Sequence, residues 1–406
     1  MLALMHFVLG LTIAHVWLLI FYFVGSAAFP WCDSAREARA PRTMTRVTCT
    51  CALGAAIAAL MLFALGSFGW LNAAGIGTGL LVVFLAACAA RRSSPFRVAF
   101  WRARIGALIR CWNVPLAVVY AAVVVVGTRA VIPEGTGYSD SIFYHLAYAQ
   151  DWANAGRLVV DPYMAFIFYA NNFVLFYTAW MVTHAAGFVQ FATWSFGLLG
   201  ALGLYAAIED TATSERGRVW AVAVGLLVVA AVVGSPIFLD YSVLGYIDIP
   251  IGTTALLSIV ALLLAIREAR SDWLFASAAI AGFLIGMKAS FVVLLSVFTI
   301  ALAWAGWLLG VRRAAVAGII VLLCAVASPW YLRNLVLAGD PVAPALNIAL
   351  YGKDGLWKAI EWNGLWNDMA TSKSPRALLT LPVRAYVRPT SSDFREYGVS
   401  ALVLFI

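Results

Sequence analysis

Apolar residues are gathered along the chain in long, nearly uncharged runs, which short polar or basic segments separate. Most runs have roughly 20 residues, the length that an α-helix needs to cross the hydrocarbon core of a bilayer. Helices are expected because backbone polar groups in lipid must pair within their own segment. The pattern therefore predicts an all-α, polytopic membrane protein. The expected spans are residues 3–29, 49–68, 74–90, 113–133, 188–208, 219–236, 250–266, 273–287, 289–310 and 314–329.

Composition agrees with this pattern. Of the 406 residues, 64% are hydrophobic and only 11% are charged, which is far more apolar than a soluble domain of this size requires. The net charge of +8 could suggest nucleic-acid binding, but the arginines stand in short loops between the apolar runs. That placement is the positive-inside pattern of membrane proteins. Membrane lipids are therefore expected as partners, and nucleic acid is not.

The arginines also predict an orientation, because loops rich in Lys and Arg stay in the cytoplasm. The loops expected in the cytoplasm are 31–48, 91–110, 216–218, 267–270 and 312–313. The turns expected on the outer side are 66–73, 134–170, 234–249 and the region after residue 328.

One apolar segment does not fit the alternation of sides. If residues 166–186 crossed the membrane, every later loop would be assigned to the opposite side. We therefore expect a re-entrant or interfacial helix there.

The chain is expected to have four parts: a three-span extension (1–112), a catalytic membrane core (113–344), an outer juxtamembrane region (345–397) and the start of a truncated span (398–406).

The stretch YSDSIFYHLAYAQD, residues 138–151, places acids, tyrosines and a histidine directly after an apolar run. Ser139 can cap a helix that ends near Gly156. Asp140, Tyr144, Tyr148 and Asp151 then share one face of a helix at the outer membrane surface. Asp140 either caps this helix or takes part in chemistry.

Three further outer segments carry charge. Asp248 lies at the mouth of a span and could simply cap it, whereas Lys288 could snorkel to lipid phosphate. Arg333, which Asn334 follows, is an arginine on the predicted outer side, where the positive-inside pattern expects few. Its planar guanidinium group is suited to binding a phosphate group. Contact with lipid headgroups is the alternative for Arg333. If the acids and cations meet, carboxylates could activate a hydroxyl while cations neutralise a phosphate leaving group.

At these residues the chain resembles the C-type (GT-C) superfamily of membrane glycosyltransferases. The matching motifs begin with Asp140 in an outer loop, Tyr144-His145-Leu146 and Gly156-Arg157-Leu158. They continue with Tyr246-Ile247-Asp248, Gly286-Met287-Lys288, PWYLRN (329–334) and GDPVAP (339–344). The resemblance covers about residues 114–344 and implies a GT-C-like helix bundle with outer juxtamembrane helices.

The resemblance implies an inverting glycosyltransferase that moves a sugar from a polyprenyl-phosphate donor to a lipid, glycan or protein hydroxyl. Asp140 would be the base and Asp248 a second catalytic or metal-positioning acid. The residues implied for substrate binding are Tyr144, His145, Lys288, Arg333 and Asn334. A divalent metal ion is left open. The expected location is the bacterial inner membrane, with the site on the periplasmic face.

A transporter or flippase of a lipid-linked glycan is the alternative from another functional class. It would use the same outer cations to hold phosphate, but it should also carry charges near mid-membrane. The predicted spans are nearly free of charge, which favours the enzyme.

Overall fold

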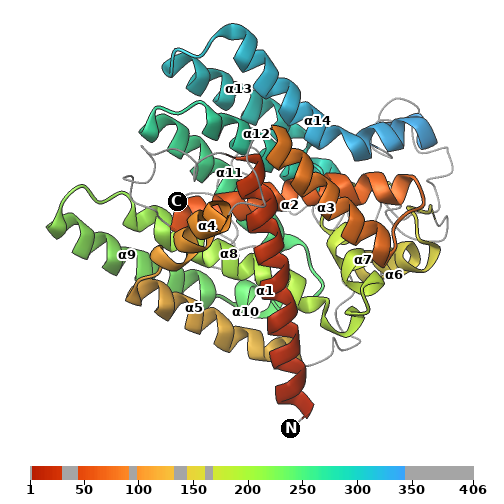
Figure 1. Cartoon of the computed structure of the whole chain (residues 1–406), viewed down its shortest axis with the longest axis horizontal. Coiled ribbons are helices and arrows are strands. Elements are labelled where there is room, and N and C mark those ends of the chain that lie inside the picture. Colours follow the sequence, from red (N-terminus) through yellow and green to blue (C-terminus); the bar gives the residue numbers. More distant parts are fainter. Residues whose placement is uncertain (1, 30–43, 91–97, 132–143, 161–167, 343–406) are drawn as a thin grey trace, which may run out of the picture.

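Every element of regular structure in the computed structural model is helical across the residues that it describes, 2–29, 44–90, 98–131, 144–160 and 168–342 (Figure 1). The all-α prediction is confirmed for these residues. The α-helices are α1 (Leu2–Ala28), α2 (Met44–Ser67), α3 (Ala73–Ala90), α4 (Val98–Arg110), α5 (Val114–Gly127), α6 (Leu146–Ala155), α7 (Val174–Val182), α8 (Gln190–Glu209), α9 (Glu215–Val233), α10 (Pro236–Tyr241), α11 (Asp248–Glu268), α12 (Asp272–Ile285), α13 (Val292–Leu308) and α14 (Arg313–Ala338). Three short 3-10 helices are η3 (Thr128–Val131), η5 (Ala186–Phe188) and η6 (Ala289–Phe291).

Eight helical segments of the described chain are long and apolar enough to cross a membrane. They are α1, α2, α3, α9, α11 and α14, together with α8 and α13 when the 3-10 turns that precede them are included. All eight correspond to predicted spans. The chain is therefore a multi-pass membrane protein.

Two predicted spans form helices that are short for a bilayer: the span expected at 113–133 contains α5, and the one expected at 273–287 agrees with α12 within two residues. Helices α5 and α12 have 14 residues each, which is about 21 Å of helix against about 30 Å of hydrocarbon. Helix α5 gives way to the 3-10 turn η3, and α12 ends at Gly286. Every residue from Ala276 to Ile285 is buried, so the apolar sequence of α12 packs mainly against protein rather than lipid.

The segment 166–186, expected to be re-entrant or interfacial, contains the nine-residue helix α7. Nine residues extend only about 14 Å, too short to cross a bilayer. Its residues from Val174 to Trp180 are all buried, so α7 is enclosed by protein. The Phe173 ring, directly before α7, lies 4.9 Å from the Phe196 ring of α8. This contact anchors α7 against the bundle.

Within the connection expected in the cytoplasm, residues 98–110 form helix α4 rather than an irregular loop, and their side of the membrane stays a prediction. This helix is bent by 84° from the segment that contains α5. Between the arginines of α4, apolar residues recur one helical turn apart. This spacing is sufficient for an amphipathic helix.

Polar contacts tie several predicted cytoplasmic segments to one another at one end of the bundle. Arg46, in the first turn of α2, forms a 2.7 Å ion pair with Glu268 of α11. Thr45 donates to Asp210, and Asn113 and Arg218 both donate to Glu209. These basic segments therefore share one end, as the positive-inside pattern requires.

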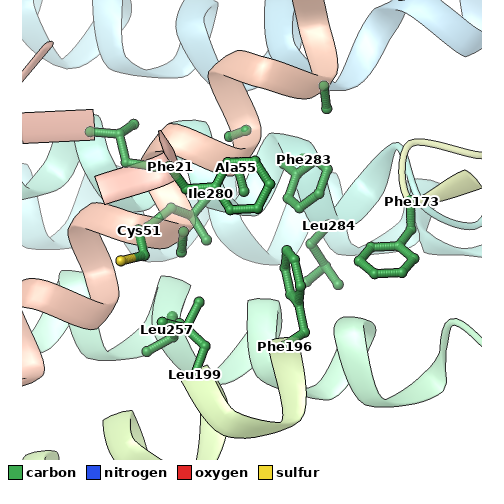
Figure 2. Packing of buried hydrophobic residues seen from close by; sticks show 14 of the residues in the cluster. Phe21, Cys51, Ala55, Phe173, Phe196, Leu199, Leu257, Ile280, Phe283 and Leu284 are labelled. Atoms are coloured by element: carbon green, nitrogen blue, oxygen red, sulfur yellow. The ribbon is translucent and has the colours of Figure 1, made fainter. Parts of the chain in front are cut away.

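The core lies where α1, α2, α8, α11 and α12 meet, and Figure 2 shows Phe21, Cys51, Phe196, Leu257 and Ile280 gathered there. Glycines allow the backbones of α1 and α2 to approach closely. A Cβ on Gly25 would meet the Thr50 carbonyl, and one on Gly54 would meet the Phe21 carbonyl. Small residues at a helix crossing are typical of membrane bundles.

Candidate functional site

Six of the seven predicted site residues lie in the described part of the chain. Asp140 falls within residues 132–143, outside that part. Tyr144 and His145 directly precede α6, and Asp248 is the first residue of α11. Lys288 is the N-cap residue of η6, and Arg333 and Asn334 lie in the last turns of α14, which is labelled in Figure 1.

The end of α6 is held by backbone hydrogen bonds to the turn between α2 and α3. Gly156 adopts the left-handed conformation, with φ of 64°, and ends the helix as the sequence predicted. The Leu71 N–H donates to the Gly156 carbonyl at 2.9 Å, and the Leu158 N–H donates to the Gly66 carbonyl at 2.9 Å. Two segments predicted to lie on the outer side are thereby joined.

His145 is buried, with 2% of its surface exposed. Its ring lies 4.1 Å from that of Tyr144, and its Nδ1 has no hydrogen-bond partner within the described structure. Burial, and secondarily the Lys288 ammonium group, lower the pKa of His145 to about 3. The imidazole is therefore neutral near pH 7, with one buried polar atom that could bond to a ligand.

The charges of Lys288 and Arg333 act on two residues at the start of α6. Lys288 interacts electrostatically with His145, and Arg333 with Tyr148. His145 and Tyr148 are three residues apart, so they are neighbours on one helical face. Cations from distant parts of the sequence thus influence the same face.

Aromatic stacking fixes α6 against α14. The Tyr148 ring stacks on that of Trp152 at 5.7 Å, and the Trp152 ring stacks on that of Trp330 at 5.5 Å. The Arg333 guanidinium lies 5.5 Å from the Trp330 ring, within cation–π range. The position of Arg333 is thereby linked to α6.

The motif PWYLRN is tied to two other segments by hydrogen bonds. Tyr331 donates to the Ile285 carbonyl at the end of α12 at 2.9 Å. The Asn334 side chain donates to the Phe168 carbonyl, and its Oδ1 lies 3.5 Å from Nη1 of Arg333. Asn334 thus holds the segment before α7 and contacts a predicted phosphate-binding residue.

Asn172 is a central residue of this region, and sequence reasoning did not select it. It is 3% exposed. Its Nδ2 donates to the Phe283 carbonyl at 3.0 Å, its Oδ1 accepts from Trp330 Nε1 at 2.8 Å, and its backbone N–H donates to the Gly286 carbonyl at 2.9 Å. The only sequence signal was two adjacent asparagines, 171 and 172, in an apolar segment.

Asp248 belongs to a neighbouring set of contacts. Two residues before it, the Tyr246 carbonyl accepts hydrogen bonds from Tyr177 of α7 at 2.9 Å and Thr193 of α8 at 3.3 Å. The Tyr246 ring stacks on that of Tyr241 at 4.5 Å. The segment that leads to Asp248 is therefore tied to α7 and α8, whereas Trp330 links Arg333 to α6 and to the segment before α7.

Residues 339–341 of the GDPVAP motif form a turn after α14. Gly339 ends α14 in the left-handed conformation, with φ of 67°. Asp340 is fully buried, and its Oδ1 accepts from the Val342 N–H at 2.9 Å. This carboxylate therefore stabilises the turn, as short polar side chains commonly do.

The two cations of this region could bind an anionic group. Within the described residues, no group of three His, Cys, Asp or Glu side chains could hold a metal. Two cations, a neutral imidazole and an amide are the groups that commonly bind phosphate. Neither a protein-family model, nor a curated protein sequence, nor a solved structure matches this chain.

Proposed function

We propose that this chain is an inverting, GT-C-type glycosyltransferase that uses a polyprenyl-phosphate sugar as donor. The acceptor is a hydroxyl of a lipid, glycan or protein on the periplasmic face of a bacterial inner membrane. The observation that supports the proposal is the packing of the Arg333 segment against α6 through Trp330 and Trp152, and its contact, through Tyr331, with Ala289 beside Lys288. A membrane-embedded donor with an anionic phosphate matches this pair of cations.

The roles follow from charge. An acceptor oxygen attacks the anomeric carbon, the bond from that carbon to the phosphate oxygen breaks, and polyprenyl phosphate departs. Asp140 takes the hydroxyl proton as general base. Lys288 and Arg333 stabilise the negative charge that grows on the leaving phosphate.

His145, Asn334 and Asp248 have supporting roles. Neutral His145, with its unpartnered Nδ1, is placed to bond to the donor, and Asn334 holds the Arg333 side chain. Asp248 acts as a second acid at the neighbouring mouth of α11. The described residues contain no group of three His, Cys, Asp or Glu side chains that could hold a metal, so a divalent ion would need further ligands.

The test is sugar transfer by the purified full chain, supplied with polyprenyl-phosphate sugars and candidate acceptors. Asp140→Asn and Arg333→Gln should each reduce turnover by a factor of at least about 100, because a base or a transition-state cation is lost. Arg129→Gln is the matched control, since Arg129 is exposed and pairs with Asp240. Full activity of Asp140→Asn would refute the proposed base.

The same protein in liposomes separates the enzyme from a lipid-linked glycan flippase. Under the proposed function, product accumulates and its formation requires Asp140. Movement of the lipid-linked sugar between leaflets without product would instead support the flippase.

A further inference from the structure

The arginine-rich helix α4 is too polar to cross a bilayer. It carries Arg102, Arg104 and Arg110 and lies at 84° to the segment that contains α5. An arginine at mid-membrane costs about 2.5–3.5 kcal/mol. A helix nearly perpendicular to a membrane-spanning segment lies along the membrane surface.

One face of α4 is fixed to the bundle through Arg104, which is fully buried. Its guanidinium donates to the Ser26 hydroxyl at 3.1 Å and to the Ser26 carbonyl at 3.1 Å, near the end of α1. The same group lies 3.6 Å from the Phe100 ring. Tyr22 donates to the Arg104 carbonyl at 3.1 Å. This face therefore has protein partners and holds α4 in a defined orientation.

Another face of α4 is apolar and exposed. Trp101, Ile105 and Ile109 are spaced at i, i+4 and i+8, which places them on one stripe. Trp101 also packs against Phe23 and Phe84, whereas Ile105 is 44% exposed and Ile109 is 67% exposed. In an interfacial helix, such a stripe enters the boundary between headgroups and acyl chains.

The two remaining arginines lie on an adjacent stripe with a glycine between them. Arg102, Gly106 and Arg110 are spaced at i, i+4 and i+8. A Cβ on Gly106 would lie 2.9 Å from a guanidinium nitrogen of Arg110, so the Arg110 side chain folds back over Gly106 toward Arg102. Both arginines are exposed, and neither pairs with a carboxylate in the described residues.

We propose that α4 lies in the membrane surface and binds the phosphate of an anionic phospholipid between Arg102 and Arg110. The apolar stripe enters the acyl region while the two guanidinium groups contact the headgroup. The arginine-rich end of a membrane protein faces the leaflet whose anionic lipids attract basic side chains. This site is at the opposite end of the bundle from the candidate glycosyltransferase site and does not depend on that function.

The experiment measures binding of phosphatidylglycerol to the full chain by native mass spectrometry, with phosphatidylcholine as the neutral probe. Arg102→Gln with Arg110→Gln should weaken phosphatidylglycerol binding about tenfold or more, because each basic residue near an anionic surface contributes on the order of 1 kcal/mol. Arg102→Lys with Arg110→Lys should keep most of the affinity. The matched control is Arg312→Gln with Arg313→Gln, which removes two exposed charges from the same end.

Four outcomes bear on the proposal. Selective loss in the α4 variant, with unchanged thermal unfolding in neutral detergent, supports it. Equal loss in the control variant overturns it, because general charge would then explain binding. Equal affinity for phosphatidylcholine also overturns it. A dimer that Ile109→Arg dissociates would show that the apolar stripe binds a second copy instead.

Discussion

The indole Nε1 of Trp330 donates a 2.8 Å hydrogen bond to the side-chain oxygen of Asn172, across 158 residues of sequence. The amide group of Asn172 also donates to the Phe283 carbonyl of α12. One buried side chain thus connects α12, α14 and the segment that leads into α7. Because Lys288 and Arg333 flank these contacts, Asn172 determines how the two cations are spaced.

Asn172→Ala should therefore destabilise the protein by about 2–4 kcal/mol. The substitution leaves the Trp330 N–H and the Phe283 carbonyl unpaired in a buried site, and each unsatisfied group costs about 1–3 kcal/mol. The measurement is equilibrium or thermal unfolding of the purified protein in detergent.

A double-mutant cycle with Trp330→Phe isolates the hydrogen bond between the two side chains. Because the phenyl ring has no N–H group, the cycle should give a coupling energy of about 1 kcal/mol or more. Strictly additive effects of Asn172→Ala and Trp330→Phe would contradict the interaction.

Gly286→Ala tests whether residue 286, two positions before Lys288, must be a glycine. A Cβ at Gly286 would overlap the amide of Asn172. The backbone angle is ordinary, with φ of −77°, so lack of space rather than backbone strain is the constraint. Forcing a methyl group into a packed site costs about 1–3 kcal/mol.

Gly252→Ala is the matched control for Gly286→Ala, because Gly252 is a helical glycine with open space where a Cβ would lie. It should be neutral or slightly stabilising, since alanine favours helix. Both variants are compared by thermal unfolding. Equal stability of the two variants would show that contact with Asn172 does not require glycine.

The sequence predicted the long spans well because each depends on a local property, an apolar run of sufficient length. It predicted α5 less well, because residues 128–131 form the 3-10 turn η3 instead of a further turn of α-helix. Helix α4 was missed for a different reason. Its arginines suggested a loop, although the spacing of Trp101, Ile105 and Ile109 was already helical.

The site was predictable only in part. The motifs identified Lys288 and Arg333 as cations of the outer segments, and the charges of both act on residues at the start of α6. Asn172 could not be selected, since its side-chain partners are 111 and 158 residues away. A residue whose role is to join distant segments has no local pattern that reveals it.

The two ion pairs Arg46–Glu268 and Arg129–Asp240 should differ in their contribution to stability. The side chains of the first are 11% and 16% exposed, and those of the second are 48% and 43% exposed. Arg46→Met leaves a largely buried carboxylate and should cost about 1–3 kcal/mol, because breaking a fully buried pair costs about 3–5 kcal/mol. Arg129→Met should cost less than about 1 kcal/mol.

Thermal unfolding at low and high ionic strength checks this difference. Salt screens the exposed Arg129–Asp240 pair more than the enclosed Arg46–Glu268 pair. Losses of equal size for Arg46→Met and Arg129→Met would contradict the role assigned to burial.

His145 should make the protein less stable as the pH falls from about 6.5 toward 3. Burial and, secondarily, Lys288 lower the pKa of His145 to about 3, whereas an unfolded histidine has a pKa of about 6.5. Between these values the unfolded state binds a proton that the folded state does not, so acid favours unfolding. His145→Gln removes this titration and should flatten the dependence of the unfolding temperature on pH.

His184→Asn, at an exposed position, is the control and should keep the wild-type slope. An unchanged slope in His145→Gln would mean that the imidazole is protonated in the folded protein.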